Sequence, residues 1–174
     1  FYRGDILYIP GCAPTLSPDE PEPTWECITY EMQAEEAQYT SGSVDNNFDG
    51  YTGDGFVNTG NSSGEWIEWS IEVADTCNAA TCMFRYACKS EDRPMELRVN
   101  GSIITTLDFP ATGEWFTWET ETFDINLTAG SNEIRLTATG ENGAPNMDKV
   151  DINICGCEIV TPAPMPDPTE DPFE

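Results

Sequence analysis

The sequence predicts an all-β protein, a sandwich of about ten short antiparallel strands. Apolar residues recur in short alternating or continuous runs, and the middle of the chain shows almost no helical periodicity. These runs are bounded by Gly, Asn, Asp and Thr, which are typical of turns. With 39% hydrophobic residues and five Trp, the chain has enough apolar surface for a proper core.

Ten runs follow one another at the short spacing of a sandwich, and we expect each to form a strand. In chain order they cover residues 27–30, 34–39, 55–58, 66–73, 82–87, 95–99, 103–108, 116–126, 132–139 and 149–154. The strongest local signal is Asn100-Gly101, which separates two apolar runs. Both residue types accept a positive φ, so this pair predicts a two-residue hairpin turn.

Proline divides the chain into three parts. Five Pro crowd residues 1–26 and five more crowd residues 158–174, whereas residues 27–157 contain only Pro94, Pro110 and Pro145. We therefore expect one folded domain over 27–157 between extended, Pro-rich N- and C-terminal segments. Residues 1–10 have the composition of a strand without a partner nearby and could be lent to a neighbouring chain. The acidic 158–174 segment is typical of a polyproline-like tail or linker.

The charge balance excludes several functions. Seven Lys and Arg stand against 32 Asp and Glu, so the net charge is −25, which excludes binding to a nucleic-acid backbone. No stretch approaches the roughly 20 apolar residues of a membrane-spanning helix, so we expect no membrane insertion. The chain has no His, which excludes Ser/His/Asp and Cys/His nucleophile systems. Acidic pairs such as Glu119 and Glu121 are interpreted as solvated strand faces, and we expect no enzyme.

Cysteines and glycosylation motifs indicate an extracellular, secreted glycoprotein. Seven Cys without any His make a zinc site improbable and favour disulfides. Asn-x-Ser/Thr motifs occur at Asn61, Asn100 and Asn126, where turns are expected. Cys77 and Cys82 enclose four residues between two expected strands, a spacing that could close a disulfide at a loop end.

Seven segments occur in an order that resembles the carbohydrate-binding modules of families 6 and 35, over about residues 28–154. They are Glu35-Glu36-Ala37, Gly50-Tyr51-Thr52-Gly53-Asp54-Gly55-Phe56-Val57, Phe84-Arg85-Tyr86-Ala87, Leu97-Arg98-Val99-Asn100-Gly101, Phe109-Pro110-Ala111-Thr112-Gly113-Glu114-Trp115-Phe116-Thr117-Trp118, Leu127-Thr128-Ala129-Gly130-Ser131-Asn132-Glu133-Ile134-Arg135-Leu136 and Asn146-Met147-Asp148. The resemblance implies a jelly-roll β-sandwich with a structural calcium ion and a sugar site in the loops at one end. Neither terminal segment is covered by it.

A sugar site needs an exposed aromatic plane beside amide or carboxylate groups, because sugars present apolar C–H faces edged with hydroxyls. Trp115 and Trp118 lie three apart, so in a strand they point to opposite faces. Alternation from Phe123 and Ile125, which we expect to face inward, places Trp115 in the core and Trp118 outside. The resemblance implies that Trp118 stacks on a sugar ring. Packing under a loop is the alternative.

Two further residues complete the expected carbohydrate-binding set of Tyr51, Trp118, Asn146 and Trp115. Tyr51 lies in a Gly-flanked loop that exposes its ring, and its counterpart in the family lies in the sugar site. Asn146 follows Pro145 in a polar turn, and its counterpart hydrogen-bonds sugar hydroxyls. A loop anchor is the alternative role for Tyr51, and turn capping is the alternative for Asn146.

Calcium is the expected cofactor, and the expected metal ligands are Gln33, Glu35 and Asp148. Calcium prefers six to eight oxygen ligands. Gln33 and Glu35 lie two apart, hence on one side of a strand, and the resemblance places Asp148 on a strand that pairs near them. The family has an acid where Gln33 stands, so one negative charge is lost. A solvated acidic strand is the alternative.

The resemblance also implies disulfides between the terminal strands, which are neighbours in this fold. A Cys27–Cys155 bridge is expected, with Cys12–Cys157 beside it. Cys88 is then the odd cysteine, either free or linking two chains.

Two functions from different classes remain open. The first is non-catalytic, extracellular binding of a glycan or polysaccharide by a calcium-stabilised module. The second is a structural subunit of an extracellular filament or glycoprotein matrix, in which the sandwich is the scaffold and the terminal segments bind copies of the chain or other subunits.

Overall fold

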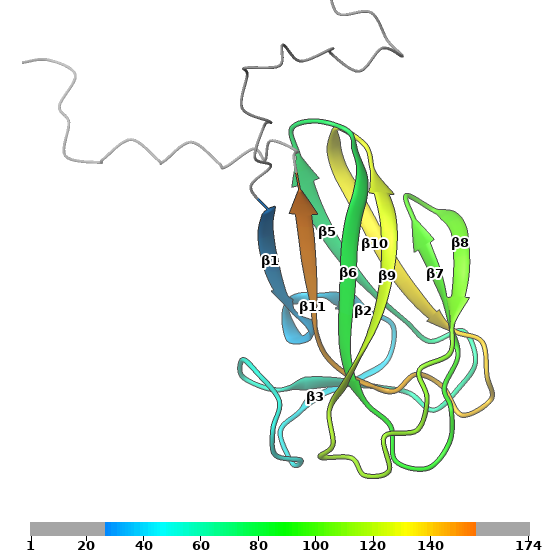
Figure 1. Cartoon of the computed structure of the whole chain (residues 1–174). Coiled ribbons are helices and arrows are strands. Elements are labelled where there is room, and N and C mark those ends of the chain that lie inside the picture. Colours follow the sequence, from blue (N-terminus) through cyan, green and yellow to red (C-terminus); the bar gives the residue numbers. More distant parts are fainter. Residues whose placement is uncertain (1–26, 156–174) are drawn as a thin grey trace, which may run out of the picture.

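The computed structural model describes residues 27–155, and these form two antiparallel β-sheets packed face to face (Figure 1). One sheet has six strands: β1 (Cys27–Gln33), β3 (Gly42–Asp45), β4 (Phe56–Thr59), β6 (Cys77–Ala87), β9 (Glu119–Leu127) and β11 (Asn146–Cys155). The other has five: β2 (Gln38–Tyr39), β5 (Trp66–Val73), β7 (Met95–Val99), β8 (Ser102–Leu107) and β10 (Gly130–Ala138). The expected all-β, jelly-roll-type sandwich is confirmed.

Strand β11 is the central strand of the six-stranded sheet. It pairs with β6 along one edge, and along the other it pairs first with β4 at Met147 and then with β1 from Lys149 onward. Cys27 faces Cys155 in the β1–β11 register, and the two form a disulfide that joins the ends of the described domain. The expected Cys27–Cys155 bridge is therefore present.

Alternating side chains from both sheets fill the core between them. In β5, Ile67, Trp69, Ile71 and Val73 are buried, whereas Ser70 and Glu72 between them are exposed. Aromatic rings join the layers: Trp69 and Phe84 lie 6.0 Å apart between centroids, and Tyr86 meets Phe109 edge-on at 4.9 Å. This core supports the loops that connect the strands of the two sheets.

The expected strand 34–39 is wrong in its first half. Residues Ala34–Glu36 form a short 3-10 helix, η1, and only Gln38–Tyr39 pair, as β2. The helix forms because Ala34 turns into the core while the amide of Ala37 donates back to the Ala34 carbonyl. The chain thereby crosses from one sheet to the other between β1 and β2, a change of partner that hydrophobic alternation does not show.

Other strands also differ from expectation, among them β1, which extends to Gln33, and β11, which begins at Asn146. Strand β6 begins at Cys77 rather than Cys82, because a bulge between Cys77 and Ala80 lets the strand continue its pairing with β9. Strand β9 begins at Glu119, not at residue 116. Strand β3 was not expected, since it is short and mostly polar, and it raises the number of strands in the described part to eleven.

The Asn100-Gly101 hairpin is confirmed. Both residues have a positive φ, 51° for Asn100 and 77° for Gly101, and they join β7 to β8. The Asn100 side chain also forms hydrogen bonds with the neighbouring strand β10. Its amide nitrogen donates to Asn132 Oδ1 at 3.0 Å, and its oxygen accepts from the Glu133 backbone amide at 2.9 Å. This network ties the hairpin to β10.

The expected Cys77–Cys82 disulfide is wrong. Both residues lie in β6, and five residues of extended strand separate their Cα atoms by roughly 17 Å, far beyond the reach of a disulfide. Cys77 is disulfide-bonded, whereas Cys82 is a free, buried thiol. Cys88, the expected odd cysteine, is also free and buried. The expected Cys12–Cys157 bridge lies outside the described residues.

Other expectations about residues 1–26 and 158–174, including the lent strand and the tail, also lie outside the described residues. Within residues 27–155, the structure contains no helix that is long and apolar enough to cross a membrane. Of the three glycosylation motifs, Asn61 lies in the β4–β5 loop and Asn100 in the hairpin turn, as expected for turns. Asn126, by contrast, lies within β9.

Candidate functional site

The loops that carry most of the expected site residues gather at one end of the sandwich. They are the β3–β4, β6–β7, β8–β9 and β10–β11 connections, and they lie opposite the end where β1 begins and β11 finishes (Figure 1). We call this region the loop end. The disulfide-closed end and the loop end are thus separated by the length of the sandwich.

Five aromatic rings form one continuous cluster at the loop end. Phe56, at the start of β4, is fully buried and lies 6.0 Å from Phe48, 5.9 Å from Tyr51 and 5.4 Å from Trp118. Phe48 in turn stacks on Trp115 at 6.2 Å. Tyr51, Trp115 and Trp118 are each half-buried, so the cluster has a buried centre and a partly exposed rim. The structure therefore brings three of the four expected sugar-binding residues into one unit.

Trp118 is held on several sides. Its indole nitrogen donates to the Asp49 carbonyl at 3.0 Å, and the Arg85 guanidinium lies 5.3 Å from the ring centroid. Gly50 packs against its edge so closely that a Cβ there would stand 3.0 Å from Cδ1. Gly50 also has a φ of 94°, which favours glycine. Trp118 is consequently fixed in orientation before any ligand arrives.

The prediction that Trp115 and Trp118 point to opposite faces of a strand is wrong. Both lie in the turn before β9, so strand alternation does not apply to them. Trp115 is half-buried rather than a core residue, and the Arg93 guanidinium lies 5.1 Å from its ring centroid. Arg93 itself donates to the Ala144 carbonyl at 2.8 Å and to Asn61 Oδ1 at 3.2 Å. It thereby links the β10–β11 loop to the aromatic cluster.

Asp148 is fully buried beneath the loop of residues 50–54. The β11–β6 register skips it, passing from the pair Met147–Tyr86 to the pair Lys149–Arg85, which marks a bulge. Its carboxylate accepts from the Thr52 amide at 2.7 Å, from the Thr52 hydroxyl at 3.1 Å and from the Arg85 guanidinium. Asp148 therefore anchors the loop that carries Tyr51.

The three expected metal ligands are brought close together around Thr52. The Thr52 hydroxyl contacts Gln33 Oε1 and Asp148 Oδ2, each at 3.1 Å, and the Asp54 amide donates to Glu35 Oε1 at 2.7 Å. The other carboxylate oxygen, Glu35 Oε2, is buried without a hydrogen-bond partner. A buried carboxylate oxygen in this state is costly unless a cation or donor reaches it.

This oxygen-rich group fits calcium in the kind of its donors, but its charge is low. Calcium prefers carboxylate, amide and carbonyl oxygens, and Gln33, Glu35 and Asp148 offer the first two. Within residues 27–155, no cluster of three or more His, Cys, Asp or Glu is arranged to hold a metal ion. The Arg85 guanidinium already compensates Asp148, which leaves Glu35 as the carboxylate with an open oxygen.

Asn146 does not lie in a turn, contrary to expectation. It is the first residue of β11, pairs with Ala87 of β6 and is only 4% exposed. Its side-chain amide makes no hydrogen bond with any residue in the described part of the chain. Asn146 thus lies at the loop end, two residues before Asp148, with donor and acceptor groups still available.

Sequence reasoning missed four residues of the loop end. Arg85, Arg93 and Phe48 contact the Trp residues as described above, and Phe116 between the two Trp is 59% exposed. Arg85 and Phe116 stand inside segments that were recognised, but nothing in a strand pattern shows which loop a strand residue will meet. Phe116 was expected in the strand of residues 116–126, whereas it lies before β9, where it has no strand face to bury.

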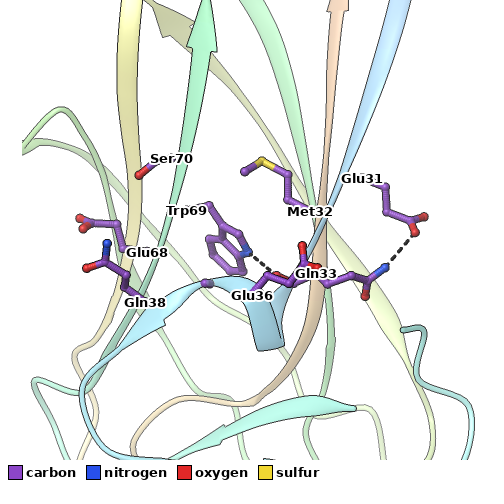
Figure 2. Close-up of a pocket in the computed structure, with 9 residues that line it drawn as sticks. Glu31, Met32, Gln33, Glu36, Gln38, Glu68, Trp69 and Ser70 are labelled. Carbon is purple, nitrogen blue, oxygen red and sulfur yellow. Dashed lines mark hydrogen bonds between the residues drawn. The ribbon is translucent and has the colours of Figure 1, made fainter. Parts of the chain in front are cut away.

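Two hollows lie away from the loop end. One, of about 350 Å³, is on the outer face of the five-stranded sheet, where Arg135 lies 4.1 Å from the Trp66 ring centroid and pairs with Glu68 at 2.7 Å. The other, of about 330 Å³, lies where β1 and η1 face β5. The second is shown in Figure 2.

Comparison with known proteins gives consistent matches. A family model described as carbohydrate binding module (family 6) matches residues 33–154. An exo-beta-D-glucosaminidase of Amycolatopsis orientalis is 41% identical over 122 residues, which are 69% of this chain and 12% of that protein. The chain spans less than a fifth of the length of the first three curated relatives it matches.

Solved structures show the same fold. A family 35 carbohydrate binding module from Clostridium thermocellum superposes with a TM-score of 0.69 and 35% identity, covering 72% of this chain and 97% of that one. A second module, Xyl-CBM35 in complex with a glucuronic acid containing disaccharide, superposes with a TM-score of 0.65 and 35% identity. It covers 70% of this chain and 91% of that one.

Proposed function

Because the chain belongs to the carbohydrate-binding modules of family 6, we propose that it binds a glycan or polysaccharide non-catalytically at its loop end, with Trp118 as the main stacking surface. The observation that carries this proposal is the aromatic cluster in which Trp118 is held by the Asp49 carbonyl and the Arg85 guanidinium. A ring fixed in advance loses little conformational entropy when a sugar stacks on it.

The neighbouring groups supply the polar half of the site. Tyr51 lies on the same cluster through Phe56, and the Asn146 amide is free of hydrogen bonds within residues 27–155. Sugar hydroxyls both donate and accept, so the Asn146 amide and the Tyr51 phenol match them in kind. Phe116, which is 59% exposed, extends the apolar surface beyond one ring and suits a chain of sugars.

We propose acid-bearing glycans as the first ligand class. The described residues contain six bases, and three of them, Arg85, Lys89 and Arg93, lie at or beside the loop end of a chain with a net charge of −25. Two of these bases, Arg85 and Arg93, place a guanidinium against the Trp118 and Trp115 rings, where it would pair with the carboxylate of a stacked sugar. The module in complex with a glucuronic acid containing disaccharide, at 35% identity, supports the same class.

Calcium binding is a further part of the proposal. Gln33, Glu35 and Asp148 would hold the ion beneath the loop of residues 50–54, and the buried, unpartnered Glu35 Oε2 supports this assignment. Bound calcium would supply positive charge that fixes this loop and therefore Tyr51. Because Gln33 replaces an acid and Arg85 compensates Asp148, we expect weak binding.

An extracellular location remains a proposal as well. The Cys27–Cys155 disulfide supports an oxidising compartment. Among the glycosylation motifs, Asn61 and Asn126 are exposed, whereas the Asn100 amide nitrogen is already engaged by Asn132. We therefore expect glycans at Asn61 and Asn126 rather than at Asn100. The alternative role as a filament or matrix subunit depends on the terminal segments and stays a prediction.

The test is affinity electrophoresis of the full chain in gels that contain glucuronoxylan, arabinoxylan, galactan or mannan. We expect retardation by glucuronoxylan and a loss of affinity of about tenfold or more in Trp118→Ala, as for other hot-spot aromatic residues. Trp66→Ala is the matched control, because it removes a half-exposed indole from the far sheet face. Equal retardation of wild type and Trp118→Ala, or none by any glycan, would overturn the proposal.

A further inference from the structure

Asn61 lies beside the aromatic cluster of the loop end. It is an exposed residue of the β4–β5 loop. Its side-chain oxygen accepts a hydrogen bond from the Arg93 guanidinium at 3.2 Å, and the same guanidinium lies 5.1 Å from the Trp115 ring centroid. Together with one C–N bond of the guanidinium, these distances place Asn61 Oδ1 within about 10 Å of the centre of the Trp115 ring.

The backbone of Asn61 is packed against the β10–β11 loop. A Cβ at Gly143 would stand 2.8 Å from the Asn61 Cα, so the two loops are in close contact there. Gly143 also has a φ of 71°, which favours glycine. Arg93 joins the same two loops, because it donates to the Ala144 carbonyl at 2.8 Å as well as to Asn61. A group attached to the Asn61 side chain would therefore start from a defined point at the loop end.

The Asn61 side chain is available for glycosylation. It begins the motif Asn61-Ser62-Ser63, and its amide nitrogen donates to no residue in the described range 27–155. The amide nitrogen of Asn100, by contrast, donates to Asn132 Oδ1. The modification needs a glycosyl diphosphate donor. A bond forms between C1 of the sugar and Asn61 Nδ2, the C1–O bond to the diphosphate breaks, the diphosphate leaves with the electron pair, and one amide proton passes to a base.

We propose that an N-glycan on Asn61 covers the Trp115 side of the loop end and weakens the binding of long glycan chains there, an inference that rests on the binding proposed above. The attached sugars present the same hydroxyls and C–H faces as a ligand, and tethering gives them a high effective concentration at Trp115. Trp118 is connected to Trp115 through the rings of Phe56 and Phe48. A short ligand on Trp118 therefore keeps its contact, whereas a chain that extends to Trp115 loses one.

The test uses the full chain secreted from a eukaryotic host, in two variants of one residue. Ser63→Ala removes the glycosylation motif and keeps Asn61, whereas Ser63→Thr keeps the motif and is the matched control. The Ser63 hydroxyl contacts only two backbone carbonyls, at 3.3 Å and 3.5 Å, so both variants should fold. Intact mass spectrometry should show one N-glycan fewer in Ser63→Ala. Equal numbers of glycans in the two variants would overturn the proposal.

Binding then measures the effect of the glycan. Ser63→Ala should bind glucuronoxylan about threefold to tenfold more tightly than Ser63→Thr, the contribution of one aromatic contact, and a glucuronic acid containing disaccharide equally well. Asn126→Gln removes the other expected glycan from β9, which ends at the disulfide-closed end (Figure 1), and should leave the affinity unchanged. Equal affinities of the two Ser63 variants for glucuronoxylan, or an equal gain in Asn126→Gln, would overturn the proposal.

A measurement without added ligand separates this inference from the loop-end proposal. The nitrogen-15 indole signal of Trp115 should differ between Ser63→Ala and Ser63→Thr, whereas the Trp66 and Trp69 signals should coincide. A difference at Trp115 in a chain that binds no glycan would support the covering of Trp115 and overturn the loop-end proposal. Identical Trp115 signals in two variants that differ by one glycan would overturn the present inference, whatever the chain binds.

Discussion

The Arg85 guanidinium forms an ion pair with the carboxylate of Asp148, which is fully buried under the loop of residues 50–54. The second guanidinium nitrogen donates to the Gly50 carbonyl at 2.8 Å, and the same group lies over the Trp118 ring. One side chain therefore connects the bulge of β11, the loop that carries Tyr51 and the proposed stacking surface.

Replacing Arg85 by Met should destabilise the protein by about 3 kcal/mol, because Asp148 would be left as an uncompensated buried charge. Chemical denaturation of the variant measures this loss. The double variant Arg85→Met/Asp148→Asn should recover a substantial part of it, since the charge is then removed with its partner. A double variant no more stable than Arg85→Met would contradict the compensation argument.

Gly50→Ala should weaken glycan binding more than Gly130→Ala does. The two glycines have nearly the same φ, 94° and 95°, so the backbone strain of an Ala is matched at about 1 kcal/mol. A Cβ at Gly50 would press on the Trp118 indole, whereas one at Gly130 meets nothing within 4 Å. Binding and denaturation measured on both variants check this. Parallel losses of affinity would show that Trp118 placement is not involved.

Removing the Cys27–Cys155 disulfide with a double Cys→Ser variant should cost about 4 kcal/mol. The bridge closes a loop with a sequence separation of 128, and long loops gain the most from closure in the unfolded chain. The midpoint of denaturation in guanidinium chloride measures the change. Because the disulfide lies opposite the loop end, glycan affinity at a temperature where the variant is folded should stay unchanged. Reduced affinity there would mean that the two ends are coupled.

The free energy of unfolding should depend on pH through the ionisation of Glu65. Hydrogen bonds from the hydroxyls of Thr40 at 2.6 Å and Ser41 at 2.7 Å lower the pKa of Glu65 below its ordinary 4.5. A lowered folded-state pKa stabilises the protein above the unfolded-state value, and this contribution is lost as pH falls through the folded-state value. Carboxyl NMR of Thr40→Val should show the Glu65 pKa rising toward 4.5.

The control for Glu65 is Thr122→Val, which changes an exposed Thr of β9 whose hydroxyl makes no hydrogen bond within residues 27–155. This variant should leave the Glu65 titration where it is. An unchanged Glu65 pKa in Thr40→Val would mean that the Thr40 hydroxyl does not stabilise the carboxylate.

The sandwich was predictable because its strands obey local rules. Alternation in β5 and the positive φ of Asn100-Gly101 are properties of neighbouring residues, and both were found in the structure. The same alternation failed for Trp115, because the rule requires a strand and the chain turns there instead. Local pattern alone cannot tell whether an aromatic pair begins a strand or precedes it.

The contacts between residues at the loop end could not be predicted from local patterns in the sequence. Asp148 faces the loop of residues 50–54 because of a one-residue bulge, and Arg85 meets Trp118 because the turn before β9 folds over β6. Both depend on packing between segments more than thirty residues apart in the chain. Nothing in the sequence around either residue indicates its partner. The hollow where β1 and η1 face β5 likewise arises from the early end of the β2–β5 pairing.

The central claim is that the glycan binds at the loop end through Trp118. The most direct measurement is nitrogen-15 NMR of the Trp indole N–H signals during a titration with glucuronoxylan oligosaccharides, with each signal assigned by a Trp→Phe variant. We predict that the Trp118 signal moves first and farthest, that Trp115 follows, and that Trp66 and Trp69 stay in place. Movement of Trp66 or Trp69 with Trp118 unchanged would contradict the claim.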